Sequence, residues 1–282
     1  MSEKWEEYYT NEQLKKLQEI ERENLKIFIN ICKKLNIDYF VYGGTLLGVE
    51  KYKGMIPWDD DIDVALPRKS YEKFVQEAQT ILPEGYIIQT PYNCTKLPYP
   101  YTKLRKSGTK YVEYIHRNID IDTGIYIDIY PVDKIPDDEK LRKKQFNNVR
   151  MWIFIYDCRQ SRLYDKVEHG IKGKIKNLVK WIICNGLKIF PQSYCMKKID
   201  YYMTMYNNSN SCRYAALNSP VFDNIYLNLF PLEDGFFDGI KVKLPGDYRT
   251  HLRMRYGDYT NLPPEEERVG HIPYILDCGN QK

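Results

Sequence analysis

The stretch between residues 41 and 66, VYGGTLLGVEKYKGMIPWDDDIDVAL, restricts what this chain can fold into more than any other part of it. Four of the five residues from 59 to 63 are aspartates. Like charges at that spacing repel one another unless a cation lies among them. From Asp61 onward polar and apolar residues alternate, which predicts a strand with Asp61 and Asp63 on one face and their apolar neighbours facing a core. Two carboxylates fixed side by side in this way suit a hard divalent cation, Mg²⁺ or Mn²⁺.

The residues upstream of the aspartates predict a site for an anion. Residues 37–42 have the composition of a strand, which Gly43 and Gly44 end, and Thr45 is a candidate N-cap for a short helix after it. A strand, a glycine pair and a helix N-terminus expose backbone N–H groups where an anion can approach. We therefore expect the backbone of Gly43, Gly44 and Thr45 to cradle phosphate beside the carboxylates, because a metal ion can bridge phosphates to carboxylates.

Simpler explanations exist for each half of this pattern. A glycine pair after a strand is usually a plain turn, and a run of aspartates is usually a solvated loop. An EF-hand calcium loop is excluded, because it requires Gly at its sixth position and Glu at its twelfth, where this chain has Val64 and Ser70 when counted from Asp59. The conjunction of Gly-Gly with Trp-Asp-Asp-Asp-Ile-Asp-Val is far more specific than either half and favours a catalytic metal site.

Two later strands supply further charged candidates. Alternation in residues 101–106 places Lys103 and Arg105 on one face, where they can balance the charge of a phosphate. The alternative is a solvated edge strand, in which lysine is a common guard. Residues 124–131 are strongly β-favouring, and an acid in their middle, Asp128, is unfavourable unless it faces a site or a partner. The aspartates at 120 and 122, in the preceding loop, are weaker candidates.

These motifs resemble a known family. The run GGTLLG…IPWDDDIDV closely resembles the LicD-type phosphocholine transferases, whose core is shared by the fukutin-related ribitol-phosphate transferases. The Lys-Leu-Arg stretch, the Gly-x-x-x-Asp-x-x-Pro pattern and the ending Tyr-Gly-Asp-Tyr…Leu-Pro-Pro extend the resemblance from about residue 28 to about residue 271, although the middle helices match poorly.

The resemblance implies a nucleotidyltransferase-like α/β fold, with a small mixed sheet flanked by helices and with helical insertions. We expect a single domain over residues 1–282, with a core at about 28–135 and 210–275 and a helical insertion at about 137–206.

The resemblance also implies an activity, the metal-dependent transfer of phosphocholine from CDP-choline to a hydroxyl of a cell-surface glycan precursor of the teichoic acid, lipopolysaccharide or capsule type. Asp61 and Asp63 are expected to hold Mg²⁺ or Mn²⁺, and Asp128 either completes the metal site or takes the proton of the acceptor hydroxyl. Lys103 and Arg105 are expected to balance the charge of the departing CMP. No Cys or Ser stands with a His in a triad motif, so direct in-line attack is the simpler mechanism.

The identity of the transferred group depends on the residues around these motifs. Choline is a permanent cation that aromatic rings hold, whereas ribitol or glycerol needs a polar pocket. Trp58 adjoins the aspartates, and Tyr126 and Tyr130 share a strand face with Asp128, which favours choline. Transfer of ribitol phosphate or glycerol phosphate, nucleotidyl transfer from an NTP, and a non-catalytic nucleotide-binding scaffold stay open as alternatives.

Long helical patterns flank these strands. A capping box at residues 10–13 begins an amphipathic helix that ends near residue 34. Further helices are expected over 137–164 and 194–206. Between them, residues 170–190 mix lysines with apolar residues, which suits either a helix on an acidic membrane surface or, the interpretation we favour, a surface helix docked on the domain.

Composition limits the partners and the compartment. The net charge of +4 is too small to indicate nucleic-acid binding, and none is expected. The seven cysteines form no Cys-x-x-Cys pair, so neither a disulfide framework nor a zinc site is indicated. With no signal peptide or membrane span visible, we expect a cytoplasmic protein with a CDP-alcohol donor, a glycan or lipid-linked glycan acceptor, and peripheral contact with the inner face of the membrane as an open option.

Overall fold

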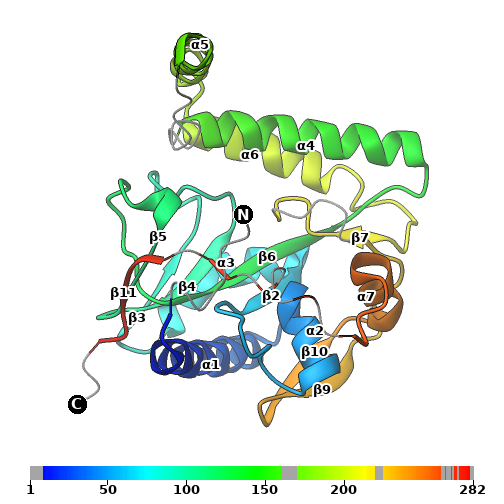
Figure 1. Cartoon of the computed structure of the whole chain (residues 1–282). Helices are drawn as coiled ribbons and strands as arrows, with labels where there is room; N and C mark the ends of the chain where they lie inside the picture. The colour runs from blue at the N-terminus through cyan, green and yellow to red at the C-terminus, as the bar shows by residue number, and fades with distance from the viewer. Residues whose placement is uncertain are drawn as a thin grey trace.

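A mixed β-sheet forms the centre of the molecule (Figure 1). The computed structural model describes residues 9–159, 170–219, 225–261, 264, 268, 270–271 and 273–279. The strands follow the order β1-β2-β6-β4-β3, and the far end of β6 also pairs with β7, which pairs with β8. β2 and β6 run parallel and the other neighbours run antiparallel. The strands are β1 (Phe40–Val41), β2 (Asp63–Pro67), β3 (Tyr86–Gln89), β4 (Thr102–Lys106), β6 (Tyr126–Lys134), β7 (Tyr214–Ala215) and β8 (Ile225–Tyr226).

Two small antiparallel sheets lie beside the central one. β9 (Glu233–Phe237) and β10 (Ile240–Leu244) form a hairpin, whereas β5 (Lys110–Glu113) pairs with β11 (Pro273–Asp277) near the end of the chain. The sequence pattern did not predict β5, β9 or β11. The pairing of β5 with β11 matters for the site, because it brings the last described part of the chain beside the aspartates.

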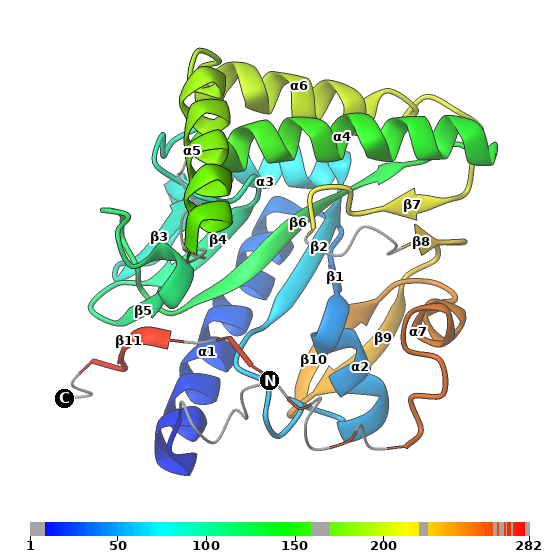
Figure 2. The same cartoon turned by 45° about the horizontal axis from the view of Figure 1, so that its top comes forward.

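Two long helices cover one face of the central sheet. α1 (Asn11–Leu35) and α3 (Arg68–Ile81) pack against each other and against strands β2, β4 and β6 (Figure 2). The predicted capping box begins α1: Gln13 N donates to Thr10 Oγ1 at 3.1 Å, and Thr10 N donates to Gln13 Oε1 at 2.9 Å. Val64 and Ile129 lie in the core beneath these helices, so the alternating residues Asp63 and Asp128 project from the opposite face.

α2 (Gly43–Tyr52) follows β1 directly. Its N-cap is Tyr42, so the prediction that Thr45 caps this helix is wrong, because the helix begins three residues earlier than predicted. Thr45 lies inside the first turn, where its Oγ1 accepts a hydrogen bond from Asp63 N at 2.8 Å. The hydroxyl thereby fastens the start of β2 to α2.

The described residues between β6 and β7 form three further helices, within the range predicted for a helical insertion. α4 (Glu139–Arg159) packs against α6 (Gln192–Thr204) around a separate apolar cluster, whereas α5 (Gly170–Leu187) stands out from the body of the molecule (Figure 1). The predicted continuation of α4 to residue 164 falls outside the described residues. The expected fold class, a mixed sheet flanked by helices, is confirmed. The single-domain boundaries stay a prediction.

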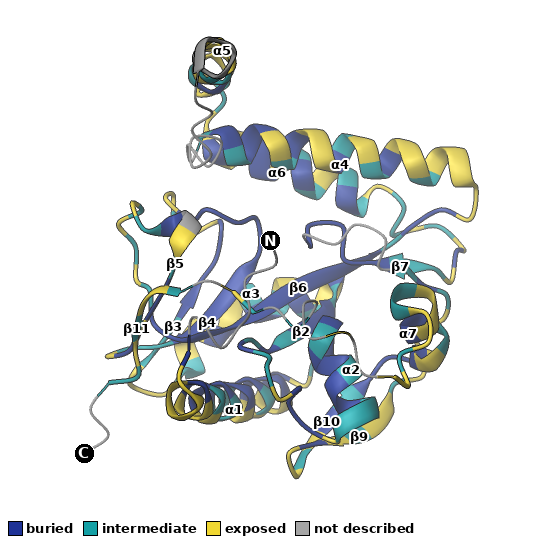
Figure 3. Cartoon of the chain, viewed as in Figure 1, coloured by how far each residue is buried: buried dark blue, intermediate teal, exposed yellow. Residues whose placement is uncertain are grey.

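Two further described elements lie outside the central sheet. They are the 3-10 helix η2 (Tyr114–His116) after β5 and the helix α7 (Tyr248–Tyr256) after β10. Figure 3 shows that the central strands are buried along most of their length, whereas the outer surfaces of α1 and α4 are exposed.

Candidate active site

A row of charged side chains crosses the middle of the sheet. The parallel register of β2 and β6 pairs Asp63 with Asp128, and the antiparallel register of β6 and β4 pairs Asp128 with Lys103. Residues in register on neighbouring strands have their side chains on the same face. Lys103 Nζ lies 2.9 Å from Asp128 Oδ1. The sheet thus brings together three residues that the sequence analysis singled out in three separate stretches.

Lys103 is enclosed by aromatic rings. Its side chain is 1% exposed, and its Nζ lies 3.1 Å from the ring centroid of Tyr126 and 4.4 Å from that of Tyr99. Burial lowers the pKa of Lys103, while Asp128 and, at 3.7 Å, Glu113 oppose that effect. In this conformation the ammonium group is therefore the internal counter-ion of Asp128.

Arg105 is also buried, with 3% exposure. Its guanidinium donates to Gln89 Oε1 at 2.6 Å, to the carbonyl oxygen of Gly124 at 2.7 Å and to the hydroxyl of Tyr99. Because β4 lies between β6 and β3, the alternative of a solvated edge strand for Lys103 and Arg105 is wrong. A role of Arg105 toward a phosphate stays a prediction.

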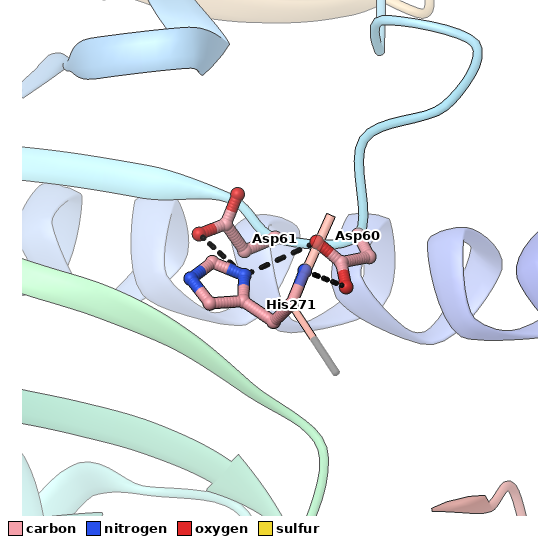
Figure 4. Close-up of side chains that lie close together, drawn as sticks. All are labelled: Asp60, Asp61 and His271. Carbon is pink, nitrogen blue, oxygen red and sulfur yellow. Dashed lines mark hydrogen bonds and ion pairs between the residues drawn. The ribbon is translucent and has the colours of Figure 1, made fainter. Parts of the chain in front are cut away.

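A second group, which the sequence analysis did not assemble, consists of Asp60, Asp61 and His271 (Figure 4). His271 Nδ1 lies 3.2 Å from Asp60 Oδ1 and 3.7 Å from Asp61 Oδ2. The carboxylate of Asp60 also accepts hydrogen bonds from Tyr9 at 2.5 Å, from Tyr111 at 2.9 Å and from the backbone N of His271 at 2.8 Å. One ligand atom from each member of the group falls within 4.8 Å of the others, so the group is compatible with a divalent metal ion.

The electrostatics of the aspartates favour a cation. Burial and the neighbouring carboxylates raise the pKa of Asp59 and of Asp63 well above the usual range. Burial raises the pKa of Asp61 to about 6, although the imidazole of His271 opposes this change. Burial would lower the pKa of His271, but Asp61 and Asp60 outweigh it and raise that pKa well above its usual value. An imidazolium beside Asp61 thus relieves part of the repulsion.

The donor atoms also fit a divalent cation. Asp63 Oδ1 is buried and accepts no hydrogen bond from any described residue. A buried carboxylate oxygen without a donor is unfavourable, and a metal ion is one way to satisfy it. The predicted set of Asp61, Asp63 and Asp128 offers oxygen ligands alone, which Mg²⁺ prefers, whereas the group with His271 adds a nitrogen.

The glycine pair lets the first turn of α2 approach these carboxylates. Gly43 has a φ of +55°, and a Cβ added there would lie 2.7 Å from Asp63 Oδ2. At Gly44 the added Cβ would lie 3.0 Å from Asp59 Oδ2. Among the described residues, none caps the N-terminus of this helix with its side chain. The predicted phosphate cradle at the backbone of Gly43, Gly44 and Thr45 stays a prediction, but both glycines directly border the aspartates.

Trp58 belongs to a neighbouring cavity of about 450 Å³. Its ring meets that of Tyr52 edge-on, with centroids 6.1 Å apart, and the guanidinium of Arg268 lies 4.9 Å from its centroid. The other two rings singled out in the sequence lie elsewhere: Tyr126 and Tyr130 are buried and donate to Glu113 at 3.0 Å and to Asp128 at 3.3 Å. The cavity is lined by Leu47, Lys51, Tyr52, Ile56, Trp58, Tyr256, Asp258, Tyr259, Asn261 and Pro264.

Several site residues had no local signal in the sequence. His271 lies 211 positions from Asp60, and Glu113 lies on β5, which the pattern did not predict. The weaker candidates at 120 and 122 lie in a loop: Asp120 pairs with Lys96 at the surface, and Asp122 accepts from Gly124 N within a turn.

Comparison with known proteins gives this site a context. Residues 36–156 match the family described as LicD/FKTN/FKRP, nucleotidyltransferase domain. The chain is 27% identical over 255 residues to the lipopolysaccharide cholinephosphotransferase LicD of Haemophilus influenzae, covering 88% of this chain and 91% of that protein. Uncharacterised proteins of Rickettsia typhi and Rickettsia prowazekii are 28% and 30% identical over 131 residues, which is 43% of this chain and 38% and 45% of theirs.

The matched residues contain β1 to β6, including Asp61, Asp63, Lys103 and Asp128. The resemblance to the LicD family that the motifs indicated is therefore confirmed, with residues 36–156 matching the nucleotidyltransferase domain of that family. The relative that matches most of its length is a transferase by name, in agreement with the expectation of a LicD-type transferase.

Proposed function

From its LicD-type domain, we propose that this chain transfers phosphocholine from CDP-choline to a hydroxyl of a cell-surface glycan precursor. The observation that carries the proposal is the row of Asp63, Asp128 and Lys103 across three adjacent strands, beside Asp61. Clustered carboxylates with a buried lysine suit the binding of a metal-bridged diphosphate. A cytoplasmic location, a glycan or lipid-linked glycan acceptor and no nucleic-acid partner belong to the same proposal.

Asp61, Asp63 and Asp128 would hold Mg²⁺ or Mn²⁺, and when bound the ion neutralises charge on the diphosphate of the donor. The chain's own residues then orient the reaction. Lys103 fixes the carboxylate of Asp128 by an ion pair at 2.9 Å. The open first turn of α2 offers N–H groups to a phosphate.

The reaction needs one proton acceptor. The acceptor hydroxyl attacks the phosphorus that bears choline, the bond from that phosphorus to the oxygen of CMP breaks, and CMP leaves with the bonding electron pair. The hydroxyl proton passes to a carboxylate. Asp128 is the residue we favour for this role if it is not a metal ligand.

The cavity lined by Trp58 suits the choline group. Four aromatic residues, Tyr52, Trp58, Tyr256 and Tyr259, line it together with the carboxylate of Asp258. A quaternary ammonium makes no hydrogen bond and is held over aromatic faces, at about 0.5–2 kcal/mol per contact. The guanidinium already lying over Trp58 indicates that this ring can take a cation.

A panel of CDP-choline, CDP-ethanolamine, CDP-glycerol and CDP-ribitol, assayed for CMP release with Mg²⁺ and a glycan acceptor, tests the proposal. We expect choline to be preferred, and Trp58→Ala to reduce that preference by about three- to thirtyfold while CMP binding is unchanged. Phe236→Ala, which removes an exposed aromatic ring from β9, is the matched control. Faster turnover of a polyol donor would refute choline as the transferred group. Pyrophosphate release from an NTP would instead identify a nucleotidyltransferase.

A further inference from the structure

α5 exposes an unusual number of large apolar side chains. Between 44% and 58% of the surface of each of six such residues is exposed to solvent. The main packing partner of α5 is α4, and Cys184 is buried. Figure 1 shows the helix standing out from the rest of the molecule. The six exposed residues are Ile175, Leu178, Val179, Trp181, Ile182 and Ile183, and Ile189, just after the end of the helix, is 78% exposed.

The apolar residues of α5 form a stripe. Ile175, Leu178, Val179 and Ile182 are spaced i, i+3, i+4 and i+7, which places them on one side of a helix. The sequence of α5 carries four lysines and no aspartate or glutamate, so its formal charge is +4. The favoured expectation, a helix docked on the domain, therefore describes only the side that faces α4.

We propose that α5 docks on the surface of an anionic phospholipid bilayer and lies in its plane. An exposed apolar stripe with lysines and a tryptophan on the same helix is the composition of interfacial helices. The stripe enters the boundary between headgroups and acyl chains, while the lysines meet the anionic headgroups. No helix in the described parts of the chain is long and apolar enough to cross a membrane, so α5 would bind at the surface.

Charge argues against a second copy of this chain as the occupant. Pairing α5 with its own copy would bring two helices of formal charge +4 together with no acidic residue on either. Like charges at a contact destabilise association. An anionic bilayer surface satisfies both the apolar stripe and the lysines. The inference does not depend on the proposed transferase activity.

Flotation of the purified full-length protein with phospholipid vesicles tests the proposal. Vesicles of phosphatidylcholine alone are compared with vesicles that also contain about 30 mol % phosphatidylglycerol, which gives them a strongly anionic surface. We expect the protein to float with the anionic vesicles and to be released by high salt, since screening weakens the attraction of the lysines. Leu178→Gln with Ile182→Gln should weaken partitioning by roughly tenfold for each side chain withdrawn from the boundary. Lys176→Gln with Lys180→Gln should weaken it by roughly fivefold for each lysine.

Matched substitutions far from α5 test whether a loss of flotation is specific to α5 or follows from any similar change of the surface. Phe236→Gln with Lys96→Gln removes one exposed ring and one exposed lysine from other elements and should leave flotation unchanged. Far-UV circular dichroism of each variant checks that it is folded. The proposal is overturned if the wild type does not float with anionic vesicles, or if both α5 variants float as well as it does. It is also overturned if sedimentation velocity shows a dimer that the Leu178→Gln, Ile182→Gln variant abolishes, because a second copy then covers the stripe.

Discussion

Replacing Gly43 by alanine tests the geometry on which the site depends. Gly43 has a φ of +55°, where an L-residue with a Cβ is strained by about 1–2 kcal/mol. The new Cβ would lie 2.7 Å from Asp63 Oδ2. Ordinary contacts begin near 3.4 Å, so the carboxylate or the helix must move by about 0.7 Å, the difference between the two distances.

A displacement of this size should affect chemistry more than stability. Misplacing a reacting or metal-binding group by about 1 Å lowers activity by roughly a hundredfold. We therefore expect Gly43→Ala to lower kcat/KM for the CDP-linked donor by about ten- to a hundredfold, and to lower the free energy of unfolding by about 1–2 kcal/mol. Donor turnover measured by CMP release and unfolding in urea give the two numbers.

Gly239→Ala is the matched control for Gly43→Ala. Gly239 has a φ of +76° in the β9–β10 hairpin, and a Cβ added there would meet nothing within 4 Å. Its backbone strain should therefore be similar, without any effect on the aspartates. Equal kcat/KM in the two variants would refute the argument that the missing Cβ of Gly43 makes room for Asp63. A comparison of Mn²⁺ affinity in the two variants would locate the cause at the carboxylates.

Other variants test the carboxylates and the core. Asp63→Asn and Asp128→Asn should each lower turnover by at least about a hundredfold and weaken Mn²⁺ binding, while Asp120→Asn at the surface changes neither, and wild-type turnover in the first two would exclude them from the site. His251 is 3% exposed, and burial lowers its pKa to about 4, so the unfolded chain binds a proton that the folded chain does not. Stability should therefore fall by about 3 kcal/mol as the pH drops from about 6.5 to about 4. The difference in free energy of unfolding between the wild type and His251→Phe, measured in urea at several pH values, should shrink over that range, and a constant difference would contradict the assignment.

The sequence predicted those parts of the fold that local patterns determine. The capping box at Thr10 indicated the start of α1, and the strand patterns at residues 101–106 and 124–131 predicted β4 and β6 to within about three residues of their observed bounds. Period-two alternation placed Asp63, Asp128 and Lys103 on strand faces, because the face of a side chain follows from its position along the strand. Their alignment in one row, however, depends on strand register, which the alternation alone does not determine.

The parts that the sequence did not predict come from contacts between distant segments. β5 and β11 form a strand pair across about 160 residues, and neither has a local pattern strong enough to predict it. His271 enters the site only because β11 pairs with β5 next to Tyr111, which itself bonds to Asp60. A histidine in an irregular segment carries no local signal for such a contact. The site residues that the motifs did not predict are therefore those that strand pairing between distant segments brings to the site.

The aspartates between positions 59 and 63 differ in their contacts. Asp60 is fully buried, and its carboxylate accepts from Tyr9, Tyr111 and the backbone of His271, so it fastens both ends of the described chain to the site. Asp61 and Asp63 are partly exposed and their carboxylates accept fewer hydrogen bonds than that of Asp60, so their oxygens can bind a cation. The density of carboxylates that first indicated a metal thus includes one that is already satisfied by the protein. Composition alone counts these aspartates together, whereas the hydrogen bonds separate an anchor from candidate ligands.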